Sequence, residues 1–301
     1  MGRSARRVVV VTVLVAGAAA CGLFPDLGGL EGDASDDVAV IDATKNEGGA
    51  DVIADAPVID APNDVIDASA GDGGCPSGRG PSMVKLDPKT CIDSTEVTVA
   101  QYRVFFNSND AGSITQIPEC GWNTTLTPAN GMPGTPNDLK PIGNINWCQA
   151  QAFCAWAGKS LCGAPEGGSY TYVAFGSASA STWMNACSAN GTQSYPYGAS
   201  FDASACNLAT FDASVPIAPA GSSVGCQGSV PGLFDMIGNV TEWDNACLPS
   251  GTDASTDLCR RRGSDVGDQG NPALKTCGWD ESDPRSHQSY TTGARCCAYL
   301  P

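Results

Sequence analysis

Apolar residues recur at helical spacing in the stretch TEVTVAQYRVFFN. Val99, Tyr102 and Phe106 fall on one face of a helix in this stretch. Thr98 and Gln101 have the spacing of a capping box, in which each side chain accepts a hydrogen bond from the backbone N–H of the other residue. The pattern therefore predicts a helix that begins directly after Thr98.

A second helix is predicted in NINWCQAQAFCAWAG. Asn146 is a favourable N-cap residue, and Gly158 is typical of the position that follows the last helical turn. Between them, small and apolar residues form one stripe along the helix, namely Trp147, Ala150, Cys154 and Ala157.

Elsewhere between Cys75 and Pro301, Gly, Pro, Ser, Asn and Asp recur so closely that long regular elements are not expected. Short strands are expected instead, for example TYVAF at residues 171–175. No change of composition divides this region, which contains all 6 tryptophans. We therefore predict one irregular α+β domain over residues 75–301.

The N-terminus has the polarity pattern of an export signal. The basic segment MGRSARR precedes an apolar stretch, residues 8–20, that is too short to span a bilayer comfortably. The stretch ends in AAAC, which resembles a bacterial lipobox. The resemblance implies that residues 1–21 are a lipoprotein signal peptide with its lipobox cysteine, and that Cys21 is lipidated and becomes the mature N-terminus. Ordinary signal cleavage beside an incidental cysteine is the alternative. The expected location is lipid-anchored, at the bacterial outer membrane or cell surface.

Residues 22–74 repeat an acidic theme, DVAVIDA, DVIADAPVIDA and NDVIDA, and Lys45 is their single basic residue. Such a segment has too little apolar surface to offset the entropy of ordering, and its like charges repel one another. We expect a disordered tether that holds the following domain away from the membrane. A calcium-binding acidic repeat is the alternative, but the fixed Asp/Gly pattern of such loops is missing.

Composition narrows the possible functions. The net charge of -16 argues against nucleic-acid binding, which needs a concentrated basic face. The chain has a single histidine, His287, which excludes a three-histidine iron site. It contains no CxxC pair, the spacing that would indicate a zinc site. Fifteen cysteines indicate an oxidising compartment, and an even number remains after Cys21. The cysteines expected in disulfides are Cys75, Cys91, Cys120, Cys148, Cys154, Cys162, Cys187, Cys206, Cys226, Cys247, Cys259, Cys277, Cys296 and Cys297.

Several segments in fixed order resemble the formylglycine-generating enzyme (sulfatase-modifying factor) domain family. CIDSTEVTVAQYRVFF is similar to the opening element of these domains, and PIGNINWCQAQAFCAWAGKSL to the next. YPYGASFDASACN follows, and then GLFDMIGNVTEW, the most specific motif of the set. RRGS at 261–264 and TGARCCA at 292–298 resemble the closing segments. The resemblance implies an irregular, C-type-lectin-like fold with little regular secondary structure.

The catalytic pair of these enzymes is missing from its usual place. In the family, two cysteines five positions apart follow shortly after the RGGS motif and bind copper(I), which soft thiolates select. Here DVGDQGNPALKT follows RRGS and contains no cysteine, so copper is not expected. Iron is not expected either, because the related iron enzymes use three histidines and this chain has one. A rearranged copper site from Cys277 with Cys296 or Cys297 is the alternative. The favoured interpretation is that Cys296 and Cys297 form disulfides with two different partners, of which Cys277 is one candidate.

The resemblance also implies structural calcium, held by oxygen ligands. One set of ligands would be the side chains of Asn239 and Glu242 with the carbonyl of Val240. The other would be Asn207, the carbonyl of Leu208, and Asp212.

Two functions remain open from the sequence. The first is a non-catalytic, surface-anchored module that binds a peptide, glycan or protein partner. The second is an active oxidase of the formylglycine-generating type with a rearranged cysteine site. In this family a groove receives an extended peptide. The aromatic residues that could line such a groove are Tyr195, Tyr197, Trp243 and Trp279, and the alternative is that they pack in the core, as aromatic residues of a small domain more often do.

Overall fold

A computed structural model describes residues 74–108, 114–209, 215–267 and 270–301. The predicted signal peptide, Cys21, the tether up to residue 73 and Asp212 lie outside these residues. Within them, no helix has the length and apolar character that crossing a bilayer requires.

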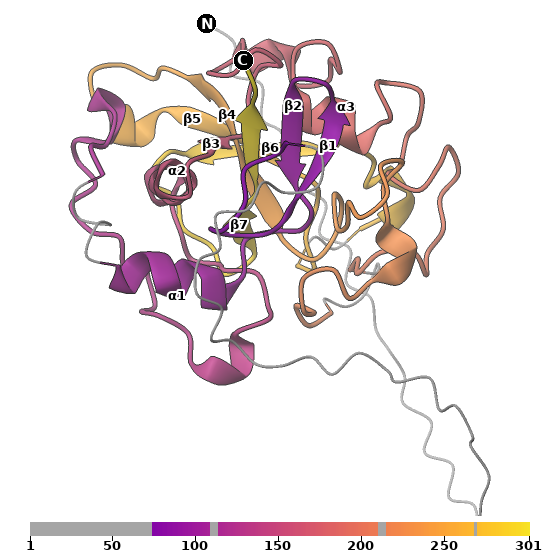
Figure 1. Ribbon diagram of the computed structural model, residues 1–301, viewed down its shortest axis with the longest axis horizontal. Helices are drawn as coiled ribbons and strands as arrows, with labels where there is room; N and C mark the ends of the chain where they lie inside the picture. Colours follow the sequence, from indigo (N-terminus) through magenta and orange to yellow (C-terminus); the bar gives the residue numbers. More distant parts are fainter. Residues whose placement is uncertain (1–73, 109–113, 210–214, 268–269) are drawn as a thin grey trace, which may run out of the picture. The chain divides into compact units, whose positions relative to one another are not determined.

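The first sheet joins the two ends of the domain. Its strands are β1 (Met83–Asp87), β2 (Thr90–Asp93), β8 (Cys296–Tyr299) and β3 (Ser160–Leu161), in the order β1-β2-β8-β3. All neighbouring strands in this sheet are antiparallel. Cys91 lies opposite Ala298, and Ser160 lies opposite Cys297. In Figure 1 the yellow β8 runs beside the indigo β2. The last strand of the chain is therefore an interior strand of the sheet.

The second sheet has the order β6-β5-β4-β7. Its strands are β4 (Thr241–Leu248), β5 (Leu258–Arg262), β6 (Asp280–Pro284) and β7 (Thr292–Ala294). The pairing of β4 with β7 is parallel, whereas the other two pairings are antiparallel. A single residue, Arg295, separates β7 from β8. This residue therefore carries the chain from one sheet to the other.

Three α-helices accompany the sheets: α1 (Val99–Asn107), α2 (Trp147–Trp156) and α3 (Thr182–Cys187). The capping box predicted at Thr98 and Gln101 is confirmed, and a second one links Asn146 with Gln149. Gly158 has a φ of 72°, which suits the residue after a helix end. The sequence did not indicate α3, whose six residues are too few to show a helical period.

One sequence-based expectation about local structure is wrong. The segment TYVAF contains a 3-10 turn, Tyr172–Ala174, instead of a strand, and the rings of Tyr172 and Phe175 lie 3.8 and 4.1 Å from the Arg260 guanidinium. In α1, Phe106 packs against the core as a partly buried residue, and Phe105 is fully buried beside it. The 3-10 turns are Pro118–Cys120, Thr135–Asn137, Tyr172–Ala174, Val224–Cys226, Ala254–Thr256 and Pro272–Leu274.

The core has two main parts. One lies between α1 and α2, where the rings of Tyr102, Phe105, Phe153 and Trp156 pack with centroids 5.2–5.8 Å apart. The other surrounds Trp183 and contains the sulfurs of several disulfides. Because regular secondary structure is sparse, the disulfides contribute much of the cross-linking within each of these two parts.

All 14 cysteines among the described residues pair into seven disulfides. The pairs are Cys75–Cys91, Cys120–Cys148, Cys154–Cys296, Cys162–Cys297, Cys187–Cys277, Cys206–Cys226 and Cys247–Cys259. The expectation that Cys296 and Cys297 have different partners is confirmed. The suggestion that Cys277 is one of them is wrong, because Cys277 lies beside α3 and pairs with Cys187.

Candidate functional site

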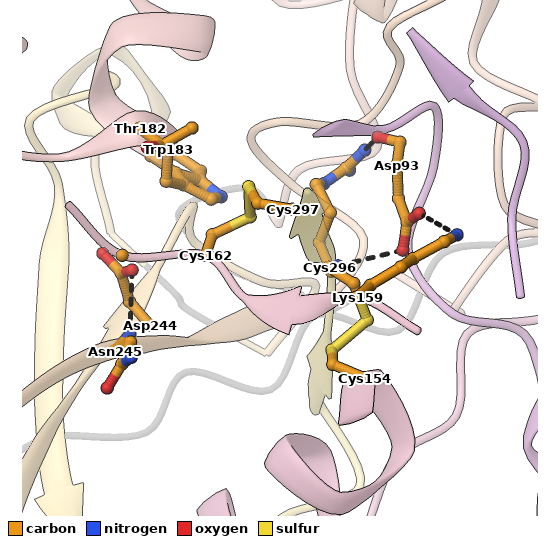
Figure 2. Close-up of a disulfide and its surroundings, with 12 residues drawn as sticks. Asp93, Cys154, Lys159, Cys162, Thr182, Trp183, Asp244, Asn245, Cys296 and Cys297 are labelled. Carbon is orange, nitrogen blue, oxygen red and sulfur yellow. Dashed lines mark hydrogen bonds and ion pairs between the residues drawn. A yellow bond between two sulfur atoms is a disulfide. The ribbon is translucent and has the colours of Figure 1, made fainter. Parts of the chain in front are cut away.

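The vicinal cysteines occupy successive positions of β8, so their side chains point to opposite faces of the strand. Cys296 reaches Cys154 on α2, and Cys297 reaches Cys162 just beyond β3, as Figure 2 shows. Both cysteines are completely buried. The salt bridge between Lys159 Nζ and Asp93 Oδ1, 2.6 Å, lies next to them. Asp93 Oδ2 also accepts a hydrogen bond from the Cys296 N–H. The pair is thus a structural junction of a helix and a sheet.

The segment after RRGS begins in a tight turn. Gly263 and Ser264 have φ values of 90° and 48°. A side chain at Gly263 would approach the Met236 carbonyl oxygen to 2.8 Å, so only glycine fits there. Asp265 then accepts a hydrogen bond from the Gly267 N–H, 2.6 Å. The nearest following cysteine is Cys277, which is completely buried in its disulfide.

Glu242 does not fit the calcium site expected at GNVTEW. Its two carboxylate oxygens accept hydrogen bonds from Arg295 at 2.8–3.0 Å, and Oε2 accepts another from Trp183 Nε1 at 2.7 Å. Asn239 Oδ1 likewise accepts from Asn207 Nδ2 and from the Ala218 N–H. A cation at this position would have to displace a buried arginine, so these residues serve another purpose.

The second calcium set is only partly described. Asn207 Nδ2 is engaged with Pro216 O and Asn239 Oδ1, whereas Asn207 Oδ1 and the Leu208 carbonyl accept no hydrogen bond from the described residues. Asp212 lies outside the described residues. Among the described residues, no three His, Cys, Asp or Glu side chains are grouped as metal ligands. The prediction at this set therefore still depends on Asp212.

What the GNVTEW segment builds instead is a buried charge cluster around Arg295. Besides Glu242, it contains the carboxylates of Glu96 and Asp235, and all four side chains are nearly or fully buried. Arg295 also donates to the carbonyl oxygens of Asp93 and Phe234, at 2.7 and 2.8 Å. Because the arginine emerges between β7 and β8, these contacts fasten both sheets to the loop before β4.

This cluster contains more buried carboxyl groups than its single arginine can neutralise. Burial, and then the Asp235 charge, raise the pKa of Glu96 well above its usual range. Burial also raises the pKa of Asp235 to about 6, although the Gly221 N–H and Arg295 oppose the rise. Glu96 Oε1 accepts from Asn239 Nδ2 at 3.0 Å, while Oε2 has no partner among the described residues. Glu96 therefore keeps its proton to a higher pH than an exposed glutamate does.

An open groove of about 500 Å³ lies beside the RRGS segment. Its walls are mostly apolar, with a lysine and two asparagines among them; they include Val99, Pro141, Pro216, Ile217, Val266 and Tyr290, with Asn137, Lys140 and Asn144. Asn144 has a φ of 58°, a conformation that the Gly-Asn dipeptide in PIGN favours. The candidate tyrosines and tryptophans do not line this groove: Trp243 is buried in the core, and Tyr195 stacks on Tyr197 elsewhere.

The groove could not be found from the sequence, because its walls come from separate segments. Val99, residues 133–144 and 215–217, Val266 and Tyr290 contribute to it, and none of them lies in a local pattern that marks a binding surface.

Comparison with known proteins identifies the family. Residues 65–299 match the family described as Sulfatase-modifying factor enzyme 1-like domain. No curated protein matches the sequence. Among solved structures, CarF is 17% identical, with 70% of this chain and 87% of CarF covered at a TM-score of 0.48. PvdO from Pseudomonas aeruginosa is 17% identical over 70% of this chain and 80% of PvdO, at a TM-score of 0.44. The variable protein 1 of Treponema denticola is 15% identical over 69% of this chain and 84% of its own, at 0.37.

These structural similarities are too low to bear on function, whereas the family match spans nearly the whole region from Cys75 to β8. It includes every motif quoted above, among them GLFDMIGNVTEW and the closing RRGS and TGARCCA. The chain therefore belongs to the family of sulfatase-modifying factor enzyme 1-like domains.

Proposed function

We propose that residues 75–301 form a non-catalytic binding domain, carried by an exported protein that is anchored through a lipid on Cys21. The observation that supports this most directly is the state of the cysteines. Cys277, Cys296 and Cys297 are each in a disulfide with a different partner. Copper(I) needs thiolates, and a disulfide sulfur carries no charge to offer the metal.

The groove beside RRGS is the proposed ligand site. Proline, valine and isoleucine walls suit apolar side chains of an extended peptide, and the amides of Asn137 and Asn144 can pair with its backbone. Lys140 adds one positive charge, which favours an acidic residue in the ligand. The ligand is accordingly a peptide segment, free or as part of a protein partner.

Counting thiols tests the non-catalytic role. The native ectodomain is alkylated without reduction, with and without copper(I), and the modified cysteines are identified by mass spectrometry. We expect no alkylation at Cys277, Cys296 or Cys297. Two alkylated cysteines in this set that copper(I) protects would instead support the oxidase.

Peptide selection tests the groove. Peptides chosen from a displayed library should bind more weakly after Tyr290→Ala, because Tyr290 is 57% exposed at the groove wall. Val173→Ala is the matched control, since Val173 is 76% exposed on another part of the domain. Equal loss in both variants would argue against the groove.

Loss of lipid labelling in Cys21→Ser would support the anchor, and unchanged labelling would contradict it.

A further inference from the structure

A second cavity of about 360 Å³ has a different chemical character from the groove. It shares no lining residue with the groove, and no charged side chain is among the described residues that line it. Its polar wall carries amides and hydroxyls, and Trp122 also lines it. We call it the amide pocket and define it by Trp122, Asn123, Thr124, Asn146, Ser286 and Gln288.

The amides of this pocket have hydrogen-bonding capacity left over. Asn146 Nδ2 donates one N–H to Asn123 Oδ1, and Asn123 Nδ2 donates one to Gln116 Oε1. An amide nitrogen has two hydrogens, so each of these residues keeps one N–H without a partner among the described residues. Gln288 uses its nitrogen on Asn144 O and Gln149 Oε1, which leaves its own Oε1 as an acceptor.

Asn123 and Asn146 are nearly completely buried, at 5% and 4% exposure, so their orientation is fixed. The disulfide Cys120–Cys148 joins the segment that carries Trp122 to the first turn of α2. Trp122 Nε1 is held by the Glu119 carbonyl, 2.9 Å away. A ligand would therefore meet a preformed wall and would lose little of its binding energy in ordering it.

We propose that the amide pocket binds a short neutral saccharide. Each sugar hydroxyl both donates and accepts hydrogen bonds, which suits a wall that offers N–H donors beside an acceptor and two hydroxyls. The aromatic face of Trp122 suits the apolar face of a sugar ring. The volume is at the lower end of the range of ligand sites, which is on the order of 300–1,000 Å³. Anionic ligands lack a basic partner here. The proposal is independent of the peptide groove.

The experiment is calorimetric titration of the full chain. The neutral probes are maltose, cellobiose, mannobiose and N,N′-diacetylchitobiose, and the charged probe is sialyllactose. We expect at least one neutral disaccharide to bind. Trp122→Ala and Thr124→Arg should each weaken that binding at least tenfold. Thr124 is exposed, and its side chain makes no hydrogen bond to the described residues, so its replacement leaves the fold intact while filling the pocket entrance.

Thr192→Arg is the matched control, because it adds the same side chain at another exposed threonine. Its binding should equal that of the unmodified chain, and near-UV circular dichroism should be the same for all variants. Failure of every neutral probe to bind, or binding of sialyllactose alone, would overturn the proposal. So would saccharide binding that survives both pocket variants. A library peptide that binds the unmodified chain but not Thr124→Arg would assign the pocket to peptide instead.

Discussion

Removing the two disulfides of β8 separately and together should reveal how much each contributes to the free energy of unfolding when the other is present or absent. The perturbation is Cys154→Ala/Cys296→Ala, Cys162→Ala/Cys297→Ala, or all four substitutions. The two disulfides have sequence separations of 142 and 135 residues. Each alone would close a very long loop, but they start and end close together in the sequence. When one is intact, the other closes only a short additional loop.

The magnitudes follow from the lengths of these loops. With either disulfide intact, the other closes a loop of roughly 9 residues, which corresponds to about 2.6 kcal/mol. With both removed, the long loop is still shortened by Cys187–Cys277 to roughly 45 residues, which corresponds to about 4 kcal/mol. The quadruple variant should therefore lose about 1.4 kcal/mol more than the two double variants lose in total.

The assay is equilibrium unfolding in guanidinium chloride without reductant. The cavities left by the removed sulfurs lower the stability of each variant in proportion to the number of disulfides removed. The loss of the quadruple variant beyond the sum of the two double variants therefore reports the loop that the two disulfides share. As a control, Cys75→Ala/Cys91→Ala removes a disulfide with a separation of 16 that lies outside this loop, and its effect should add to that of Cys162→Ala/Cys297→Ala. Losses for the β8 pair that add within about 0.5 kcal/mol would refute the reasoning.

Three further predictions concern charge and calcium. Folded Asp235 keeps a proton that the unfolded chain releases, so this residue alone should lower the free energy of unfolding by up to about 3 kcal/mol as the pH rises from 3.8 to about 6. Burial raises the pKa of Asp93 and of Asp244 to about 6 as well, so the share of Asp235 is measured in urea melts as the difference between the unmodified chain and Asp235→Asn. Glu96→Gln should also make the fall with pH less steep, and stability that rises with pH over this range would contradict the reasoning. Glu242→Gln should cost about 3–5 kcal/mol because it removes the buried carboxylate that accepts the Arg295 hydrogen bonds at 2.8–3.0 Å. Glu281→Gln, at a partly exposed ion pair, should cost less than about 1 kcal/mol, and equal costs in denaturant melts would be inconsistent with a buried pair. If Asn207, Leu208 and Asp212 bind calcium, a calcium concentration about 100-fold above Kd should add about 2.7 kcal/mol and raise the melting temperature, and an unchanged transition in EDTA would contradict the site.

Local features of the fold were predictable from the sequence, and long-range ones were not. The helix starts at Thr98 and Asn146 follow from side chains three residues apart, so a short window of sequence contains all that determines them. The interior position of β8 depends on its pairing with β2, about 200 residues earlier in the chain. No short window contains that information.

The candidate site shows the same division. The absence of cysteine from residues 265–276 was visible in the sequence, because it concerns one short segment after RRGS. The role of Glu242 was not visible, because Arg295, which donates hydrogen bonds to its carboxylate, is separated from it by 53 positions. An Asn and a Glu close together in the sequence resemble a calcium site until the buried arginine is placed beside them.

The interior position of β8 also has a consequence for synthesis. β2 and β3 do not pair with each other; both pair with β8, which follows every other element along the chain. The first sheet therefore cannot be completed before β8 has been synthesised. Incomplete chains expose unpaired strand edges and the thiols of Cys154 and Cys162 to proteases and oxidants. A chain that lacks β8 therefore differs from the complete domain both in its exposed strand edges and in its free thiols.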